Sequence, residues 1–178
     1  MIIFVGAAGS GKSIQARLLA QELKCDYLSM GQFLRDNVTP EVKQKMLTGT
    51  LISDQDVVQI ISNALAMTPY DKEFILDGFP RTLFQADWLI TQVHDGKFRI
   101  KTVINLKSSA EVTVPRLLER RRPDDNMAAI TQRLNEFNSS IMAILGDFQK
   151  AGIRITTINA EETIERVHAN IMAAIKTV

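Results

Sequence analysis

The segment GAAGSGKS, at residues 6–13, constrains the fold of this chain more than any other. It follows a short β-rich apolar run, Ile2–Val5, and it opens a stretch, Lys12–Lys24, in which apolar residues recur at helical spacing. A strand, a glycine-rich turn and a helix in this order match the phosphate-binding pattern G-x-x-x-x-G-K-[ST]. The glycines let backbone N–H groups point at phosphate oxygens, and the helix N-terminus adds a favourable dipole. We therefore predict a nucleotide phosphate site here; the alternative is a glycine-rich turn without a ligand.

Two side chains of this loop carry further predictions. Lys12 is expected to reach the β- and γ-phosphates of a nucleotide, and the hydroxyl of Ser13 to join the shell of Mg²⁺. The pattern alone does not name a reaction, because GTPases, ATPases and small-molecule kinases all use it. A second set of cationic residues has to decide between them.

The remainder of the chain alternates between strand-like and helix-like segments. We expect further strands at Cys25–Leu28, Glu73–Asp77, Lys101–Leu106 and Ile153–Ile158. An apolar stripe predicts a long helix over residues 127–150. This alternation predicts an α/β fold of three layers, α/β/α, with a five-stranded parallel sheet whose ligands bind beyond the carboxyl ends of the strands.

Two helix starts are predicted from short capping patterns. Ser108 with Glu111 forms a capping box, in which each side chain bonds a backbone N–H at the other end of the first turn. Asn159 with Glu162 forms a second, weaker box before the C-terminal apolar stripe.

Composition excludes several classes of function. The chain has 178 residues, enough for one domain with a hydrophobic core, and its formal net charge is +1. That balance argues against a general binder of nucleic acid or of membrane surfaces, since both carry a basic excess. The single cysteine, Cys25, excludes an internal disulfide and a zinc site of several thiolates. We expect a cytoplasmic protein, because no apolar run approaches a membrane span and the N-terminus lacks a basic leader region.

The second set of cations centres on LDGFPRTLFQA, residues 76–86. Together with GAAGSGKSIQA, this stretch resembles the adenylate kinase family of nucleoside monophosphate kinases. The resemblance continues in order through LSMGQFLRD (28–36), GTLISD (49–54), RRRPDDN (120–126) and INAEE (158–162). It covers nearly the whole chain, and its Asp-Gly-Phe-Pro-Arg piece is quite specific to that family.

The resemblance implies a fold of the P-loop NTPase type and a phosphotransferase of nucleotide biosynthesis. Such an enzyme moves the γ-phosphoryl group of Mg-ATP to a nucleoside monophosphate, so ATP and the monophosphate are the expected partners and Mg²⁺ the expected cofactor. Each terminal phosphate carries roughly −1.5 to −2 charges at neutral pH. Bringing two such groups together requires several arginines, whose planar guanidinium groups chelate phosphate oxygens.

The resemblance also implies which residues form the site. ATP would be bound by Gly9, Ser10, Gly11, Lys12, Ser13, Ile14, Arg116 and Arg120. The monophosphate would be bound by Met30, Arg35, Thr50, Leu51, Ile52, Gly78, Phe79, Arg81, Gln85, Arg122 and Arg133. The catalytic set would be Lys12, Arg81, Arg116, Arg120, Arg122 and Arg133. The metal would be held by Ser13 and, through water, by Asp77. Asp124 and Asp125 would hold the arginines and the closing lid.

The charges at RRRPDDN fit this assignment. Arg116 and Arg120 are four residues apart and therefore share one helix face. Pro123 is predicted to break that helix, and Asp124 and Asp125 to begin the next one, where anionic side chains are favoured. The alternative is a solvated charge run at a helix turn.

Gln85 is the residue that favours AMP as the acceptor. A glutamine amide offers a donor and an acceptor, and so can pair with N1 and the N6 amine of adenine together. Met30 opposes this choice, because it stands where adenylate kinases usually have threonine. Two alternatives therefore stay open: a kinase for UMP, CMP or another monophosphate, and a nucleotide-binding regulator with weakened catalysis. Gln32, in place of the family's aspartate, favours the regulator weakly.

The lid is the largest departure from the family pattern. One residue separates Arg120 from Arg122, so the long zinc-bearing or β-rich lid is absent and no zinc is expected. We predict a single kinase domain over 1–178, with an acceptor-binding insert at about 30–55 and a very short lid at about 120–126. His94 and His168 have no partners at ligand spacing and are expected on the surface. A monomer is expected, with no nucleic-acid or membrane partner.

Overall fold

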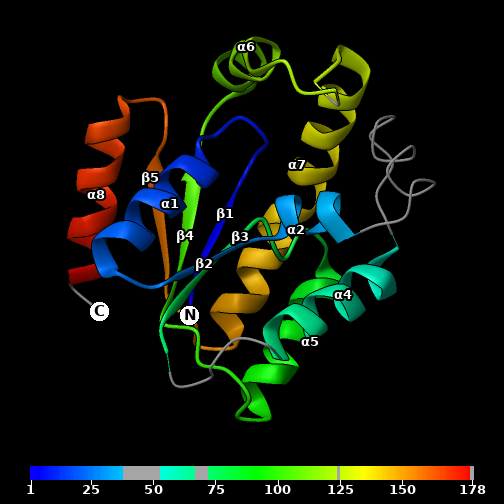
Figure 1. Cartoon of the computed structure of the whole chain (residues 1–178), viewed down its shortest axis with the longest axis vertical. Helices are drawn as coiled ribbons and strands as arrows, with labels where there is room; N and C mark the ends of the chain where they lie inside the picture. Colours follow the sequence, from blue (N-terminus) through cyan, green and yellow to red (C-terminus); the bar gives the residue numbers. More distant parts are fainter. Residues whose placement is uncertain (38–52, 67–71, 124, 177–178) are drawn as a thin grey trace.

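The computed structural model describes residues 1–37, 53–66, 72–123 and 125–176, and it centres on a parallel sheet (Figure 1). The strands are β1 (Ile2–Gly6), β2 (Asp26–Ser29), β3 (Phe74–Asp77), β4 (Thr102–Lys107) and β5 (Ile155–Asn159). They lie in the order β2-β3-β1-β4-β5, and every neighbouring pair is parallel. The predicted α/β fold with a five-stranded parallel sheet is confirmed.

Seven helices are described, and most of them cover the two faces of the sheet. The helices α1 (Lys12–Leu23) and α8 (Ile164–Lys176) pack on one face. The opposite face is covered by α2 (Met30–Asn37), α4 (Asp54–Ala66), α5 (Leu83–His94) and α7 (Met127–Lys150). Strand β1 shows how one sequence serves both faces, because alternate side chains of a strand point in opposite directions. Ile2 and Phe4 face α1 and α8, whereas Ile3 and Val5 face the other layer.

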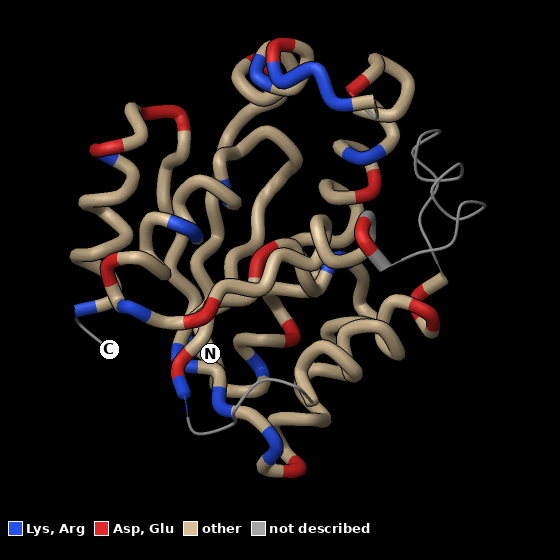
Figure 2. Tube along the Cα trace, in the orientation of Figure 1, with Lys and Arg blue, Asp and Glu red and all other residues tan. Residues whose placement is uncertain are grey.

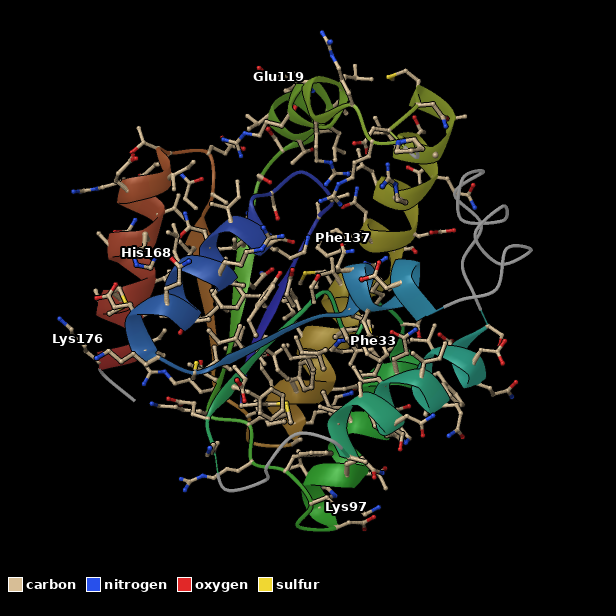
Figure 3. All side chains as sticks on the ribbon, viewed as in Figure 1. Phe33, Lys97, Glu119, Phe137, His168 and Lys176 are labelled. Atoms are coloured by element: carbon tan, nitrogen blue, oxygen red, sulfur yellow. The ribbon has the colours of Figure 1, made fainter. Side chains whose placement is uncertain are left out.

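Helix α6 (Ala110–Arg120) lies beyond the carboxyl ends of the strands rather than on a face of the sheet (Figure 1). A small apolar cluster connects it to the phosphate-binding loop and to α7. In that cluster Ala7 packs with Leu117 and Leu134, and Phe137 of α7 lies on the side that faces the loop (Figure 3). This packing places α6 and the start of α7 over the carboxyl edge, where the site was predicted.

Both predicted capping boxes are wrong. Helix α6 has Ser109 as its N-cap residue, and the Ser109 N–H donates to a carboxylate oxygen of Glu161, 2.7 Å away. The acceptor thus comes from a distant segment instead of from Glu111. Asn159 is the last residue of β5, paired with Lys107, and α8 begins five residues later. Strand pairing therefore extends over the position at which a cap was expected.

The helix break was also predicted at the wrong residue. Helix α6 ends at Arg120, and Arg121 adopts a left-handed conformation with φ 56°, two residues before Pro123. Helix α7 begins at Met127, and its cap is Asn126, whose side chain accepts a hydrogen bond from the Ala129 N–H. The connection between the two helices is therefore residues 121–126.

His168 is less exposed than the sequence suggested. Its side chain is 20% exposed and lies between α8 and α1 (Figure 3). One ring nitrogen is 3.3 Å from Gln15 Oε1 and the other 2.9 Å from a carboxylate oxygen of Glu22. None of the helices in the described part of the chain is both long and apolar enough to cross a bilayer.

Candidate active site

A cleft of about 630 Å³ opens at the carboxyl edge of the sheet. It brings together side chains from the phosphate-binding loop, α2, the β3–α5 turn, α6 and α7. The predicted site residues that line it are Gly9, Gly11, Lys12, Ser13, Ile14, Met30, Asp77, Gly78, Phe79, Arg81, Gln85, Arg116, Arg120, Arg122 and Arg133. Predictions for Thr50, Leu51, Ile52, Asp124 and the side chain of Arg35 lie outside the described residues.

The glycines of the loop are required by its geometry. Gly9 has φ +81°, and a Cβ atom there would lie 2.7 Å from the carbonyl oxygen of Thr113 in α6. Gly11 has φ +89° and is the N-cap residue of α1, with no described atom within 4 Å of a Cβ placed there. The first N–H groups of a helix lack partners within it. Gly11, Lys12 and Ser13, at the start of α1, line the cleft, so N–H groups without a partner in the helix are available to a phosphate there.

Lys12 lies inside the cleft with its ammonium group close to the loop. Lys12 Nζ donates a hydrogen bond to the carbonyl oxygen of Ala7, 2.7 Å away. Burial lowers the pKa of Lys12 to about 8; the Asp77 carboxylate opposes this shift, whereas Arg81 and Arg120 add to it. A bound polyphosphate would restore the charged form, because it supplies opposite charge beside the amine.

Asp77 ends β3 at the floor of the cleft and is 2% exposed. Its Oδ2 atom accepts hydrogen bonds from the hydroxyls of Ser13, at 2.6 Å, and Tyr27, at 2.9 Å. Its Oδ1 atom is buried and has no hydrogen-bond partner among the described residues. A buried carboxylate oxygen that accepts no hydrogen bond, beside a serine hydroxyl, fits hydrated Mg²⁺. This ion prefers oxygen ligands and retains several waters. No group of three His, Cys, Asp or Glu side chains arranged as a metal site occurs in the described ranges.

Sequence reasoning missed Tyr27. This residue pairs with Ile75 across β2 and β3, so it points to the same face as Asp77, two residues further along β3. Burial raises the pKa of Tyr27, and the negative charge of Asp77 raises it further, so the hydroxyl remains a donor. The order of β2 and β3 in the sheet was the missing information.

Asp125 joins the arginines of α6 and α7. Its carboxylate accepts two hydrogen bonds from Arg120, at 2.7 and 2.8 Å, and one from Arg133, at 3.1 Å. It also accepts the backbone N–H of Arg122 at 3.1 Å. Burial alone would raise the pKa of Asp125, but the hydrogen bonds from the arginines outweigh it and lower the pKa below its ordinary value. Asp125 therefore positions arginines; it does not serve as the first-turn anion of α7 that its sequence position suggested.

Arg116 and Arg120 line the cleft from the same side of α6, as their spacing predicts. Arg116 Nη1 donates to the carbonyl oxygen of Ala160, 3.0 Å away, which fixes the direction of its side chain. Three consecutive arginines, residues 120–122, lead from the end of α6 into the connection to α7 (Figure 2). Of the arginines in this region, Arg116, Arg120 and Arg122 line the cleft together with the phosphate-binding loop.

The opposite end of the cleft holds Arg81 and Gln85. Gly78, with φ +79°, turns the chain after β3, and Arg81 Nε donates to its carbonyl oxygen at 3.0 Å. Gln85 is 4% exposed: its Oε1 accepts the Arg81 N–H at 2.8 Å, and its Nε2 donates to Asp54 Oδ1 at 2.7 Å. Met30 is buried and forms part of the adjoining apolar wall. Sequence reasoning did not identify Asp54.

A match to a protein-family model decides the family of this chain. The model described as adenylate kinase matches residues 4–153. The chain belongs to the adenylate kinase family. It is 31% identical to an adenylate kinase of Corynebacterium glutamicum (strain R), over 98% of each chain. It is 33% identical to adenylate kinase 1 of a Synechocystis strain, over 98% of this chain and 96% of the relative.

The resemblance inferred from the motifs is thereby confirmed, and the chain is a nucleoside monophosphate kinase, a P-loop phosphotransferase. A kinase of this family brings two phosphate-bearing substrates together. Phosphoryl transfer needs little covalent chemistry from the protein; it depends on alignment and on neutralising the charge of the migrating group. Lys12 with the arginines of α6, α7 and the β3–α5 turn offers cations on several sides of one cleft.

Proposed function

We propose that this kinase transfers the γ-phosphoryl group of Mg-ATP to AMP and releases two molecules of ADP. The observation that carries the choice of AMP is the Gln85 amide, which lines the cleft beside Arg81. An amide nitrogen has two hydrogens and an amide oxygen two lone pairs. After the bonds to Asp54 and Arg81, one of each is left for N1 and the N6 amine of adenine.

The ATP side of the reaction is assigned to the loop and to α6. The N–H groups at the start of α1, between Gly9 and Ile14, would bind the β- and γ-phosphates, with Lys12 adding a positive charge. Arg116 and Arg120 would lie against the phosphates from the other side. Ser13 and, through water, Asp77 would hold Mg²⁺, which supplies charge neutralisation at the β- and γ-phosphates when it is bound.

The acceptor side is assigned to Arg81 and Gln85, with Met30 and Phe79 as apolar wall and Arg35 as a second phosphate ligand. A phosphate oxygen of AMP forms the new bond to the γ-phosphorus while the bond to the β–γ bridging oxygen breaks. That oxygen keeps the electron pair and leaves as part of ADP. No general base is required, because the acceptor phosphate is already anionic at neutral pH. Arg122 and Arg133 would stabilise the migrating group.

The acceptor-binding insert and the lid are assigned to short segments. We take residues about 30–55 as the acceptor-binding insert of a single domain and residues about 120–126 as the lid. A connection as short as 121–126, between the ends of α6 and α7, encloses less of the cleft than a folded lid would. Some ATP hydrolysis without acceptor is the expected consequence, because water is excluded less well.

A panel of acceptors tests the proposal. The protein is mixed with Mg-ATP and, separately, with AMP, dAMP, GMP, UMP or CMP, and ADP production is followed. The expected result is fast turnover with AMP and slower turnover with GMP, UMP and CMP. Faster turnover with UMP or CMP would overturn the choice of acceptor but retain the phosphoryl-transfer chemistry. ATP binding without any turnover would indicate the regulator instead.

A further inference from the structure

Both polar atoms of the Gln85 amide are hydrogen-bonded, the nitrogen to an acceptor and the oxygen to a donor. Its nitrogen donates to the Asp54 carboxylate at 2.7 Å, and its oxygen accepts the Arg81 backbone N–H at 2.8 Å. A carboxylate only accepts and a backbone N–H only donates. Turning the amide over would therefore place oxygen against oxygen at Asp54 and hydrogen against hydrogen at Arg81. One orientation of Gln85 is strongly favoured before any substrate binds.

Amide orientation decides which purine the cleft accepts. Adenine presents an acceptor at N1 and a donor at its 6-amino group, whereas a 6-oxopurine presents a donor at N1 and an acceptor at O6. The Gln85 amide pairs with adenine in one orientation, and with a 6-oxopurine only after the amide has turned over. We propose that Asp54 is a positioning residue that fixes the Gln85 amide and thereby selects 6-aminopurine over 6-oxopurine monophosphates. This inference rests on the proposed function, since it takes adenine as the base recognised by Gln85.

Asp54 is itself placed so that its carboxylate cannot easily turn away. It is the first residue of α4, after Ser53, and it is half-buried between α4 and α5, which lie side by side (Figure 1). Its Oδ1 atom accepts a second hydrogen bond from the hydroxyl of Thr82, at 2.8 Å. It lies behind Gln85, outside the described lining of the cleft, so it acts through Gln85 and does not touch the substrate.

A purely structural role makes a different prediction. Thr82 is the N-cap residue of α5 and accepts the Gln85 N–H, so Asp54 and Gln85 could serve to stabilise the start of that helix. In that case, removing the Asp54 carboxylate would lower the stability of the protein. It would affect all acceptor monophosphates alike, because the orientation of the amide would not matter.

The test compares AMP with IMP, which differ only at N1 and C6 of the base. Steady-state kcat and KM are measured for both at saturating Mg-ATP, in the wild type and in Asp54→Ala, Asp54→Asn and Asp56→Ala. Asp54→Asn retains an oxygen that accepts from Gln85 and Thr82. Asp56→Ala is the matched control: it removes the same charge from the same first turn, where Asp56 contacts Ser53.

In Asp54→Ala, the ratio of kcat/KM for AMP to that for IMP is expected to fall about tenfold, the size of one charged hydrogen bond. Most of the loss should appear in KM for AMP, with KM for ATP unchanged. Asp54→Asn should stay within about threefold of the wild-type ratio, because a neutral oxygen still accepts. Asp56→Ala should leave the ratio unchanged.

A folded Asp54→Ala protein with the wild-type ratio would overturn the inference while AMP remains the established acceptor. A wild type that prefers UMP or CMP would overturn the proposed function, and this inference with it. If Asp54→Ala does not fold, Asp54→Ser takes its place, because its shorter side chain also leaves the Gln85 nitrogen without a carboxylate. The same ratio then decides.

Discussion

Asp125 accepts two hydrogen bonds, of 2.7 and 2.8 Å, from the guanidinium group of Arg120. Arg120 is the last residue of α6, and Asp125 lies two residues before the start of α7. The carboxylate is completely buried, whereas the Arg120 side chain is 33% exposed. Arg133, from α7, shares the same carboxylate. Arg120, assigned to the ATP phosphates, and Arg133, assigned to the migrating phosphoryl group, are thus fixed relative to one another before nucleotide enters. This lowers the cost of ordering them during the reaction.

Replacing Asp125 by asparagine tests this arrangement. Two arginines then lose their shared negative charge, so we expect kcat to fall by at least tenfold and the free energy of unfolding to fall by about 1–3 kcal/mol. Both are measured, the first by coupled assay and the second by urea denaturation. The control is Asp147→Asn, which breaks the exposed pair with Lys150 and should change neither quantity appreciably. Wild-type kcat in a folded Asp125→Asn protein would contradict a positioning role.

The lowered pKa of Lys12 predicts how ATP affinity depends on pH. With a pKa of about 8 in the free protein, Lys12 is charged below pH 7 and increasingly neutral above pH 8. Polyphosphate favours the charged form, so binding above pH 8 must take up a proton. The dissociation constant for ATP should therefore change little between pH 7 and 7.5 and should rise by up to tenfold per unit above pH 8. Calorimetric titrations from pH 7 to 9.5 measure it.

Lys12→Arg is the control for that titration, because arginine keeps its charge throughout this range. It is expected to bind ATP more weakly than the wild type, since the guanidinium does not fit the space of an ammonium, but with no rise above pH 8. A wild-type dissociation constant that stays level to pH 9.5 would show that ATP binding does not depend on the protonation of Lys12.

Tyr27→Phe removes one of the two hydroxyl donors to Asp77 without changing the ring. The remaining donor, Ser13, is the one assigned to the metal shell, so Asp77 should be held less firmly. We expect the free energy of unfolding to fall by about 1 kcal/mol and the Mg²⁺ concentration for half-maximal ADP binding to rise several-fold. Thr157→Val is the control, because its hydroxyl bonds Asn105 elsewhere in the sheet. Equal Mg²⁺ dependence in all three proteins would exclude Tyr27 from this role.

Local sequence was sufficient to predict the phosphate-binding loop and the strands. The contacts that were not predicted join residues far apart along the chain. The pattern from Ile2 to Leu23 consists of contiguous residues, so it predicts strand, turn and helix together. Tyr27 and Asp77 are 50 residues apart, and their contact depends on β2 lying next to β3. Periodicity gives the faces of each strand but not the order of strands in a sheet.

The resemblance named most of the residues around the cleft but, apart from Asp125, not the residues that position them. Asp54 and Tyr27 act through Gln85 and Asp77, and no spacing in the sequence marks such a partner. The resemblance implied that Asp125 holds arginines, and the structure shows that these are Arg120 and Arg133. The break at Arg121 was missed because a non-glycine residue in the left-handed region has little sequence signature.

Gly9 has a strict steric requirement where the phosphate-binding loop contacts α6, and Gly9→Ala tests it. The new Cβ would meet the Thr113 carbonyl oxygen at 2.7 Å and Leu117 Cγ at 3.0 Å, and φ +81° is unfavourable for alanine in any case. Either the loop or α6 has to move, so we expect a loss of at least about 2 kcal/mol in the free energy of unfolding, together with a loss of ATP affinity of tenfold or more.

For Gly146→Ala we expect the opposite change, a gain in the free energy of unfolding. Gly146 lies within α7, and apart from the adjacent backbone of that helix no described atom comes within 4 Å of a Cβ placed there. The substitution should raise the free energy of unfolding by about 0.5–1 kcal/mol, because alanine has less conformational freedom to lose in a helix, and it should leave ATP affinity unchanged. Denaturation and calorimetry on both variants give the comparison. If Gly9→Ala were as stable as Gly146→Ala and bound ATP equally well, α6 would not pack on the loop as described, and its arginines would not be held over the phosphates by that contact.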